Sequence, residues 1–223
     1  MTWDYYDDPR PDIQVLVAPA GRSVLDVGCA SGALGAALKD QGARHVSGVE
    51  SSREAASRAR HRLDRVVEGD ILNVPLPFDP AEFDYIVFAD VLEHLIDPQA
   101  ALRRYLPFLT ANGRVVISVP NMRFYTVLLR LLVDRWSYTD SGVRDRTHLR
   151  IFTRHSLLVL IADVGLTVEQ FHRNYRLIED QSRIGRLGVL ATRVVRATLA
   201  PWLFSDLLAF QYLVSARREQ GRS

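Results

Sequence analysis

The chain has 223 residues, of which 48% are hydrophobic and 24% charged, with a net charge of +2. This length suits one globular domain, and the composition excludes disordered, collagen-like and low-complexity classes. The longest uninterrupted apolar run, 157–162, is far shorter than the roughly 20 residues that a transmembrane helix needs. We expect no secretory signal, because the N-terminus is acidic and aromatic. Cys29 is the only cysteine and has no internal disulfide partner, so we expect a reducing, cytoplasmic setting.

The charge is divided unevenly along the chain. Residues 1–100 contain 9 basic and 17 acidic side chains, whereas residues 101–223 contain 19 and 9. Nearly all cations are arginine, with Lys39 the only lysine, which is typical of a GC-rich genome. The basic half is either a solvated surface or the footprint of an anionic partner such as a phosphate, a membrane surface or nucleic acid.

Short apolar or β-branched runs alternate with helical stretches. We expect strands at 23–27, 45–49, 65–68, 84–88, 114–119, 168–174 and 208–216, and helices at 33–41, 53–62, 98–109 and 154–164. The pair Asn112-Gly113 predicts a turn before the fifth strand. The alternation is typical of a parallel sheet with crossover helices, which predicts an α/β fold with a doubly wound, Rossmann-like sheet.

Two apolar segments lie outside this alternation. Residues 122–136 predict a helix inserted before the final strands. Residues 184–199 predict a second helix, with apolar side chains on one side and arginines on the other. The second helix either packs on the core with a wet arginine face, or lies on lipid at the inner face of the membrane, or receives an anionic substrate.

The strongest motif is V-L-D-V-G-C-A-S-G at 24–32. There a strand runs through a turn of small residues into a helix, so backbone N–H groups face the strand's carboxyl end, where nucleotide-like ligands bind. A dinucleotide-binding array needs further glycines after Gly28, but this chain has Ala30 and Ala33. A nicotinamide or flavin site is therefore disfavoured.

Three further strand ends carry compatible groups. Glu50 ends the second strand and can accept hydrogen bonds from both hydroxyls of a ribose. Asp70 and Ile71 follow the third strand and offer a carboxylate to an exocyclic amine and an apolar side chain to a purine. Residues 89–91 follow the fourth strand. Four strand ends in register favour a nucleoside ligand over unrelated helix caps.

These stretches resemble the class I S-adenosylmethionine-dependent methyltransferases, in particular small bacterial enzymes related to the ubiquinone-biosynthesis O-methyltransferases. The resemblance covers about residues 20–175 and rests on VLDVGCASG, Glu50, EGDI at 68–71, FDYIVFADVLEHL at 83–95 and NGRVVISVPN at 112–121. It implies a seven-stranded, mostly parallel sheet whose last strand is antiparallel, with 208–216 as that strand's partner. It also implies S-adenosylmethionine as cofactor and S-adenosylhomocysteine as product.

By this resemblance the methionine moiety lies against Asp26, Gly28 and Gly32, the ribose on Glu50, the adenine between Asp70 and Ile71, and the sulfonium near Ala89. We assign cofactor contacts to Asp26, Gly28, Cys29, Ala30, Gly32, Glu50, Ser51, Asp70, Ile71, Ala89, Asp90, Val91 and His94, and we assign no metal ligand. Ala30 departs from the family pattern, which has glycine there. We expect Ala30 to keep a negative φ and to alter the loop slightly.

The resemblance also divides the single domain. Residues 1–20 are expected to form an N-terminal tail or a lid over the cofactor, with Tyr5, Tyr6 and Arg10. Residues 21–120 form the cofactor-binding half, and residues 121–223 supply the acceptor-binding helices and complete the sheet.

For a hydroxyl acceptor, the enzyme must align the oxygen with the methyl carbon and remove a proton. We expect His148 to be the base, with Asp145 orienting its imidazole; alternatively the two residues only tie their loop to the next helix. His94 either contacts the methionine end, positions the acceptor or packs under the cofactor. The nearby Arg144, Arg146 and Arg150 are expected to pair with a substrate phosphate or carboxylate.

The sequence is compatible with several functions. The stretch 145–153 resembles methyltransferases of cell-surface glycan synthesis, so the first hypothesis is O-methylation of a small or lipid-linked sugar hydroxyl. The second is O-methylation of a polyprenylated phenol, with the apolar helix at 122–136 covering the tail. The third is a cofactor-binding module without catalysis. We expect no nucleic-acid substrate, because no N-P-P-Y motif follows the fourth strand.

Overall fold

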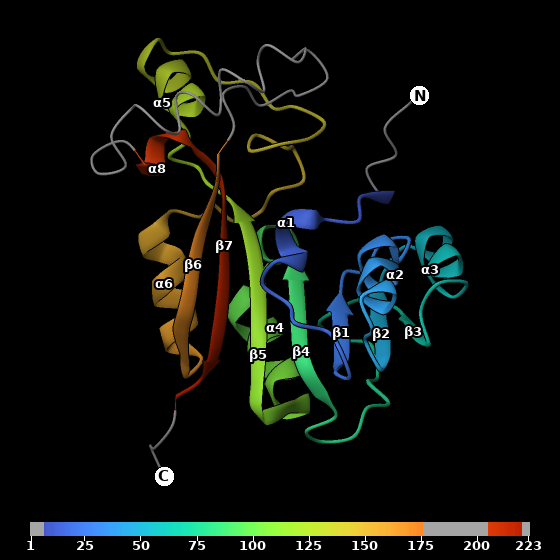
Figure 1. Cartoon of the computed structure of the whole chain (residues 1–223). Coiled ribbons are helices and arrows are strands. Elements are labelled where there is room, and N and C mark those ends of the chain that lie inside the picture. The colour runs from blue at the N-terminus through green and yellow to red at the C-terminus, as the bar shows by residue number, and fades with distance from the viewer. Residues whose placement is uncertain (1–6, 176–204, 220–223) are drawn as a thin grey trace.

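The computed structural model describes residues 7–175 and 205–219, which share one seven-stranded sheet in the order β3-β2-β1-β4-β5-β7-β6 (Figure 1). The strands are β1 Ser23–Val27, β2 His45–Glu50, β3 Arg65–Glu68, β4 Phe83–Ala89, β5 Leu109–Pro120, β6 Leu166–Tyr175 and β7 Ala209–Arg218. Strands β1 to β5 pair in parallel, whereas β7 runs antiparallel to both β5 and β6. The predicted fold class is confirmed, and the segment expected as partner of the antiparallel strand is that strand itself.

The helices confirm the predicted alternation but are mostly shorter. They are α1 Pro11–Gln14, α2 Ala33–Asp40, α3 Arg53–Ala59, α4 Pro98–Tyr105, α5 Tyr125–Leu132, α6 Arg154–Asp163 and α8 Ser205–Leu208, with 3₁₀ turns η2 Leu92–His94 and η3 Leu106–Phe108. Side chains of Ser52, Asp97 and Thr153 cap α3, α4 and α6 by accepting backbone N–H bonds. The helix expected at 98–109 changes to a 3₁₀ turn at Leu106, since Pro107 has no N–H to donate. The helix predicted at 184–199 lies outside the described residues.

The fifth strand starts earlier than its sequence predicts. β5 begins at Leu109, and its register with β4 shifts between the pairs Phe83–Leu109 and Tyr85–Arg114. The expected turn at 112–113 is therefore an irregular stretch within the strand, not a separate loop.

The sheet is covered on both faces. Every residue of β1 is buried. Leu25 and Val27 belong to the hydrophobic cluster that includes α4 and α6, whereas Val24 belongs to the one that includes α1 and α2. Successive strand residues point to opposite faces, so a central parallel strand needs apolar side chains on both. Among the described helices, none is both long and apolar enough to cross a bilayer.

The candidate site lies at one edge of the sheet, at the carboxyl ends of its parallel strands. The carboxyl ends of β1, β2, β4 and β5 point toward the same edge, where α1 lies, and α5 lies beyond them (Figure 1). Groups at the ends of these strands are thus neighbours in space.

The turn between β1 and α2 differs from the prediction at Ala30. Its φ is +48°, in the left-handed region, and Gly28 and Gly32 have φ of +77° and +80°. A left-handed conformation costs a residue with a Cβ about 1–2 kcal/mol. The Ala30 N–H donates to Glu50 Oε2 at 2.9 Å, and this bond holds the alanine in the conformation that glycine would adopt freely.

We expect Ala30→Gly to stabilise the protein by about 0.5–1 kcal/mol, because relief of the left-handed strain exceeds the extra chain entropy of glycine. Urea denaturation measures this change in the free energy of unfolding. The matched control is Ala36→Gly within α2, which should destabilise by about 0.5–1 kcal/mol. Equal losses of stability in the two variants would contradict this account of the turn.

Candidate active site

The carboxylate of Glu50 joins the turn after β1 to the start of α3. The residue is only 7% exposed, and its Oε1 accepts the Ser52 N–H at 2.7 Å while Oε2 accepts the Ala30 N–H. The Ser51 hydroxyl lies 3.4 Å from Oε1. A carboxylate has about four acceptor positions, so two backbone donors leave capacity for the two hydroxyls of a ribose.

Asp26 is a buried carboxyl group in the middle of this arrangement. It is 2% exposed, on the strand that leads into the turn. Burial raises the pKa of Asp26 to about 7, the negative charge of Glu50 adds to the rise, and the positive charge of Arg10 opposes it. Asp26 therefore titrates near neutral pH, and a cation placed beside it would favour its ionised form.

The turn itself tolerates no added bulk at Gly28. A Cβ there would lie 2.5 Å from Val91 Cγ2, so Val91, two residues after the end of β4, packs against the turn after β1. Cys29 is 4% exposed, and burial raises the pKa of its thiol, which makes it a packing residue of this turn.

The carboxylate of Asp70, which follows the third strand, bonds to residues of its own loop. Asp70 Oδ1 accepts the Leu72 N–H at 2.9 Å and Oδ2 accepts the Asn73 side-chain amide at 2.6 Å; these bonds lower the pKa of Asp70. Ile71 is 8% exposed and packs in the core. The assignment of both residues to the adenine stays a prediction, and Ile71 presents little free surface for it.

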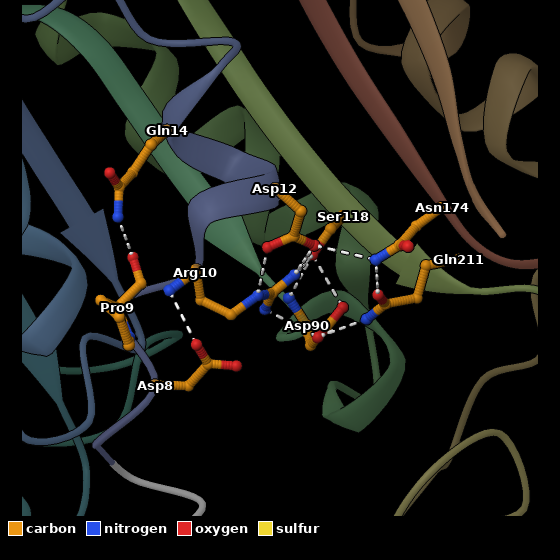
Figure 2. A network of polar contacts seen from close by, with 9 residues as sticks. All are labelled: Asp8, Pro9, Arg10, Asp12, Gln14, Asp90, Ser118, Asn174 and Gln211. Atoms are coloured by element: carbon orange, nitrogen blue, oxygen red, sulfur yellow. Dashed lines mark hydrogen bonds and ion pairs between the residues drawn. The ribbon is translucent and has the colours of Figure 1, made fainter. Parts of the chain in front are cut away.

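The N-terminal segment crosses the carboxyl edge of the sheet. Figure 2 shows the Arg10 side chain among groups from several elements, where it donates to Asp12 at 3.0 Å, to Asp90 at 2.8 Å and to the Ser118 hydroxyl at 3.1 Å. The Asp7 carboxylate accepts the Ser31 hydroxyl at 2.6 Å. Residues 7–12 thus lie between the turn after β1 and the ends of β4 and β5, whereas Tyr5 and Tyr6 lie outside the described residues.

Asp90 is the centre of this network. Its backbone is left-handed, with φ +55°, and its carboxylate also accepts the Ser118 hydroxyl and the Gln211 amide, both at 2.7 Å. The Asn174 amide reaches Gln211 and Asp12 at 3.2 and 3.3 Å (Figure 2). No pattern in the sequence marks Ser118, Asn174 and Gln211 as site residues, because each is an ordinary polar residue of its own strand.

A second cluster lies just beyond Asp90. Glu93, His94 and His148 each place a ligand-type atom within 4.8 Å of the others. The two imidazole rings are 4.8 Å apart at 66°. Glu93 is 1% exposed, and its Oε2 has no hydrogen-bond partner within residues 7–175 and 205–219. The adjacent acid and histidine after β4 were visible in the sequence, but their approach to His148 was not.

The hydrogen bonds determine which ring nitrogens are free. His148 Nδ1 lies 3.2 Å from the Val143 carbonyl, which can only accept, so Nδ1 carries the proton and Nε2 has the lone pair. The Thr147 hydroxyl donates to Asp145 at 2.7 Å and therefore accepts from His94 Nδ1 at 3.1 Å. Both histidines thus have an unprotonated Nε2 in their neutral form.

Asp145 does not have the role that the sequence predicted. Its Oδ1 accepts the backbone N–H and the hydroxyl of Thr147, at 2.8 and 2.7 Å, and the Val143 carbonyl orients His148 instead. The turn at 145–147 directs the Asp145 carboxylate toward Thr147 of its own loop. Asp145 still acts on His148 through its charge.

The surroundings shift the pKa values of half-buried His148 and buried Glu93 in opposite directions. Burial, helped by the neighbouring His94, lowers the pKa of His148, so this imidazole is neutral at pH 7. Burial and the negative charge of Asp90 raise the pKa of Glu93 well above its usual range. An ionised Glu93 needs a positive charge beside it, so the cluster can hold either a proton or a divalent cation.

The three arginines of this loop are engaged within the protein. Arg144 is 5% exposed and donates to the Ser137 carbonyl and hydroxyl. Arg150 donates to the Ile96 carbonyl, and Arg146 pairs with Asp140 at 2.6 Å. Their expected pairing with a substrate anion therefore competes with bonds that already hold the loop.

Comparison with known proteins agrees with this geometry. Residues 5–171 match a family model described as a methyltransferase domain. The chain is 29% identical over 182 residues to a ubiquinone biosynthesis O-methyltransferase of Alkalilimnicola ehrlichii, covering 76% of this chain and 73% of that protein. It is 34% identical over 173 residues to that of Xylella fastidiosa, covering 72% and 70%.

Solved structures of methyltransferases share the fold of this chain. A crystal structure of an S-adenosylmethionine-dependent methyltransferase from Mesorhizobium loti superposes with a TM-score of 0.63, at 19% identity, over 93% of this chain and 96% of that one. At this identity the likeness shows the fold, and the family match adds the activity. The chain belongs to the methyltransferase domain family and is a class I S-adenosylmethionine-dependent methyltransferase.

Proposed function

We propose that the enzyme methylates a hydroxyl oxygen and that His148 accepts the proton of this hydroxyl. The observation that carries the proposal is the bond from His148 Nδ1 to the Val143 carbonyl, which leaves Nε2 as a fixed, neutral base. Bound S-adenosylmethionine supplies an electrophilic methyl group on a sulfonium. When the acceptor oxygen takes the methyl group that the cofactor supplies, His148 Nε2 would receive the hydroxyl proton, and S-adenosylhomocysteine would leave as the product.

The strand ends supply the other side of the reaction. Glu50 is suited to the ribose hydroxyls and Asp26 to the positively charged methionine moiety, because they carry carboxyl groups at the ends of adjacent strands. Ala89 is the last residue of β4, and Asp90 and Val91 come directly after it, ahead of Glu93 and His94 in the chain. The reacting groups would therefore meet near the end of β4.

The acceptor that fits best carries an apolar portion. Leu149 and Ile151 are 57% and 63% exposed. They belong to the loop in which the backbone N–H groups of Leu149 and Arg150 donate to the Glu93 carbonyl. Ile96, bonded through its carbonyl to Arg150, is 70% exposed. Such residues can hold an isoprenoid chain. The relatives named for ubiquinone biosynthesis also favour a polyprenylated phenol.

A lipid-linked sugar hydroxyl is the second candidate, because the same apolar residues would hold its lipid portion. The three arginines expected to pair with a substrate anion are bonded within the protein, so we rank this candidate after the phenol. For either acceptor we propose a cytoplasmic enzyme, and we propose no nucleic-acid substrate.

His148→Ala should lower kcat by at least about 10²-fold, because general-base catalysis contributes on this order. The dissociation constant of S-adenosylmethionine should change by less than about twofold, since the base contacts the acceptor. Turnover is measured with a short-chain polyprenylated phenol, and binding by calorimetry. His155→Ala, an exposed histidine on α6, is the matched control.

Unchanged turnover in His148→Ala would contradict the assigned base, and binding without turnover of any hydroxyl acceptor would favour the non-catalytic module. Repeating the assay with EDTA and with added Zn²⁺ tests whether the cluster at Glu93, with its two imidazoles and one carboxylate, also takes a cation.

Glu50→Ala should weaken S-adenosylmethionine binding by about 10- to 100-fold, the equivalent of one charge-assisted hydrogen bond. The measurement is calorimetric titration with the cofactor and its demethylated product. Glu68→Ala is the control, because Glu68 pairs with Glu50 in register at the end of the neighbouring strand. Equal effects of the two substitutions would contradict a specific ribose contact.

Cofactor affinity should rise as pH increases from about 5.5 to 7. The raised pKa of Asp26, about 7, means that the carboxyl is largely protonated at the low end, and binding of a cation must then release a proton. Asp26→Asn should flatten this pH dependence. Calorimetry in buffers of different ionisation enthalpy counts the released protons, and the same proton release in Asp26→Asn would refute the assignment.

A further inference from the structure

The outer surface of α5 is apolar where a soluble enzyme is normally polar. Leu129, Leu131, Leu132 and Val133 are 56%, 53%, 81% and 63% exposed. The helix is anchored at its other end, where Phe124 and Val127 pack against Val143 and Phe210. Surface helices of soluble proteins usually expose their polar face. A run of exposed aliphatic residues at the end of an anchored helix indicates a contact with something apolar.

The residues that follow continue this surface. Trp136 and Tyr138 are 40% and 62% exposed, and their rings meet edge to face at 5.8 Å. Trp and Tyr favour the boundary between lipid tails and water, because each ring has an apolar body and a polar group. We call residues 129–138 the α5 surface.

Positive charges are interleaved with these apolar side chains. Arg123, Arg130 and Arg135 are all exposed, and Asp134 is the only acid between residues 122 and 136. Arginine can bury its methylene groups beside apolar neighbours while its guanidinium reaches lipid phosphates. A second copy of this chain would fit less well, since a two-fold contact through α5 would bring like charges together.

The α5 surface is also joined to the active site. The backbone of Thr139, directly after Tyr138, pairs with Arg144 and Arg146 through bonds of 3.0 Å each. The same loop continues to Asp145 and His148, and α5 lies beyond the carboxyl edge of the sheet (Figure 1). A surface that binds lipid there would face the mouth of the site toward a membrane.

We propose that the α5 surface docks the enzyme on an anionic membrane surface. Leu129, Leu132 and Trp136 insert among the lipids, while Arg130 and Arg135 contact anionic head groups. The helix lies on the bilayer and does not span it. The docking rests on exposure and charge at α5 and is independent of the proposed acceptor, although it would bring a lipid-linked acceptor to the active site.

The test is flotation of the full-length protein with vesicles of phosphatidylcholine alone or with phosphatidylglycerol. We expect binding to the anionic vesicles that weakens in high salt. Leu132→Asp should reduce the partition coefficient by about tenfold or more, and the pair Arg130→Glu with Arg135→Glu should remove the preference for anionic lipid. The matched control is Val159→Asp on α6, where a valine is 43% exposed outside the α5 surface.

Failure of the wild-type protein to bind either vesicle would overturn the proposal, as would equal binding by Leu132→Asp and Val159→Asp. A melting temperature lowered by Leu132→Asp but not by Val159→Asp would show that protein covers Leu132, and a wild-type dimer that Leu132→Asp dissociates would show a second copy there. Either result also overturns membrane docking. Cofactor titration of Leu132→Asp should match that of the wild type, which separates this outcome from a failure of the catalytic proposal.

Discussion

The ion pairs of the Arg10 side chain, which is 14% exposed, constrain how the N-terminal segment meets the sheet. Burial opposes the charge of this side chain, but Asp90 and Asp12 outweigh the opposition and raise the pKa of Arg10. Removing one partner of such a pair typically costs about 3–5 kcal/mol, since a charge is left uncompensated. Through Asp90 and Gln211 the same network reaches the end of β4 and the start of β7. Ion pairs and hydrogen bonds, and not hydrophobic packing, thus connect the N-terminal segment to the carboxyl edge of the sheet.

Backbone strain collects at the same edge. Arg10, Ala30 and Asp90 all have left-handed φ, of +51°, +48° and +55°. Each is held by a hydrogen bond to a carboxylate or hydroxyl from another element: Asp90 by Ser118, Ala30 by Glu50, and Arg10 by its side-chain partners. Strained residues persist where their surroundings determine them, and they cluster at functional sites. The left-handed residues therefore lie in three segments that meet at this edge: the N-terminal segment, the turn after β1 and the residues after β4.

The acceptor side is organised differently, by a loop instead of strand ends. The segment that carries His148 is connected to η2 by backbone bonds from Leu149 and Arg150 to the Glu93 carbonyl. These bonds bring together the two histidines and buried Glu93, whose Oε2 has no hydrogen-bond partner among the residues that the structure describes. The same loop connects to the apolar end of α5. One peptide segment therefore links His148, the proposed base, to the α5 surface.

The sequence alone was sufficient for the sheet, the cofactor turn and the family. Strand and helix patterns are local, with periods of 2.0 and 3.6 residues, and a strand ending in small residues before a helix has few structural solutions. Because parallel strands end at one edge, Asp26, Glu50, Asp70 and Asp90 could be grouped from their positions in the strand order.

The tertiary structure decided the hydrogen-bond partners. Arg10 and Asp90 are 80 positions apart, and the Thr147 hydroxyl reaches the His94 ring across 53. The sequence also did not predict the bonding partner of the Asp145 carboxylate or the sign of φ at Ala30. The carboxylate turned toward its own loop, and the alanine took a left-handed φ because Glu50 accepts its N–H. Local patterns constrain each segment's own backbone, but a polar side chain bonds to whichever partner packing brings within 3 Å or so, and packing depends on the whole chain.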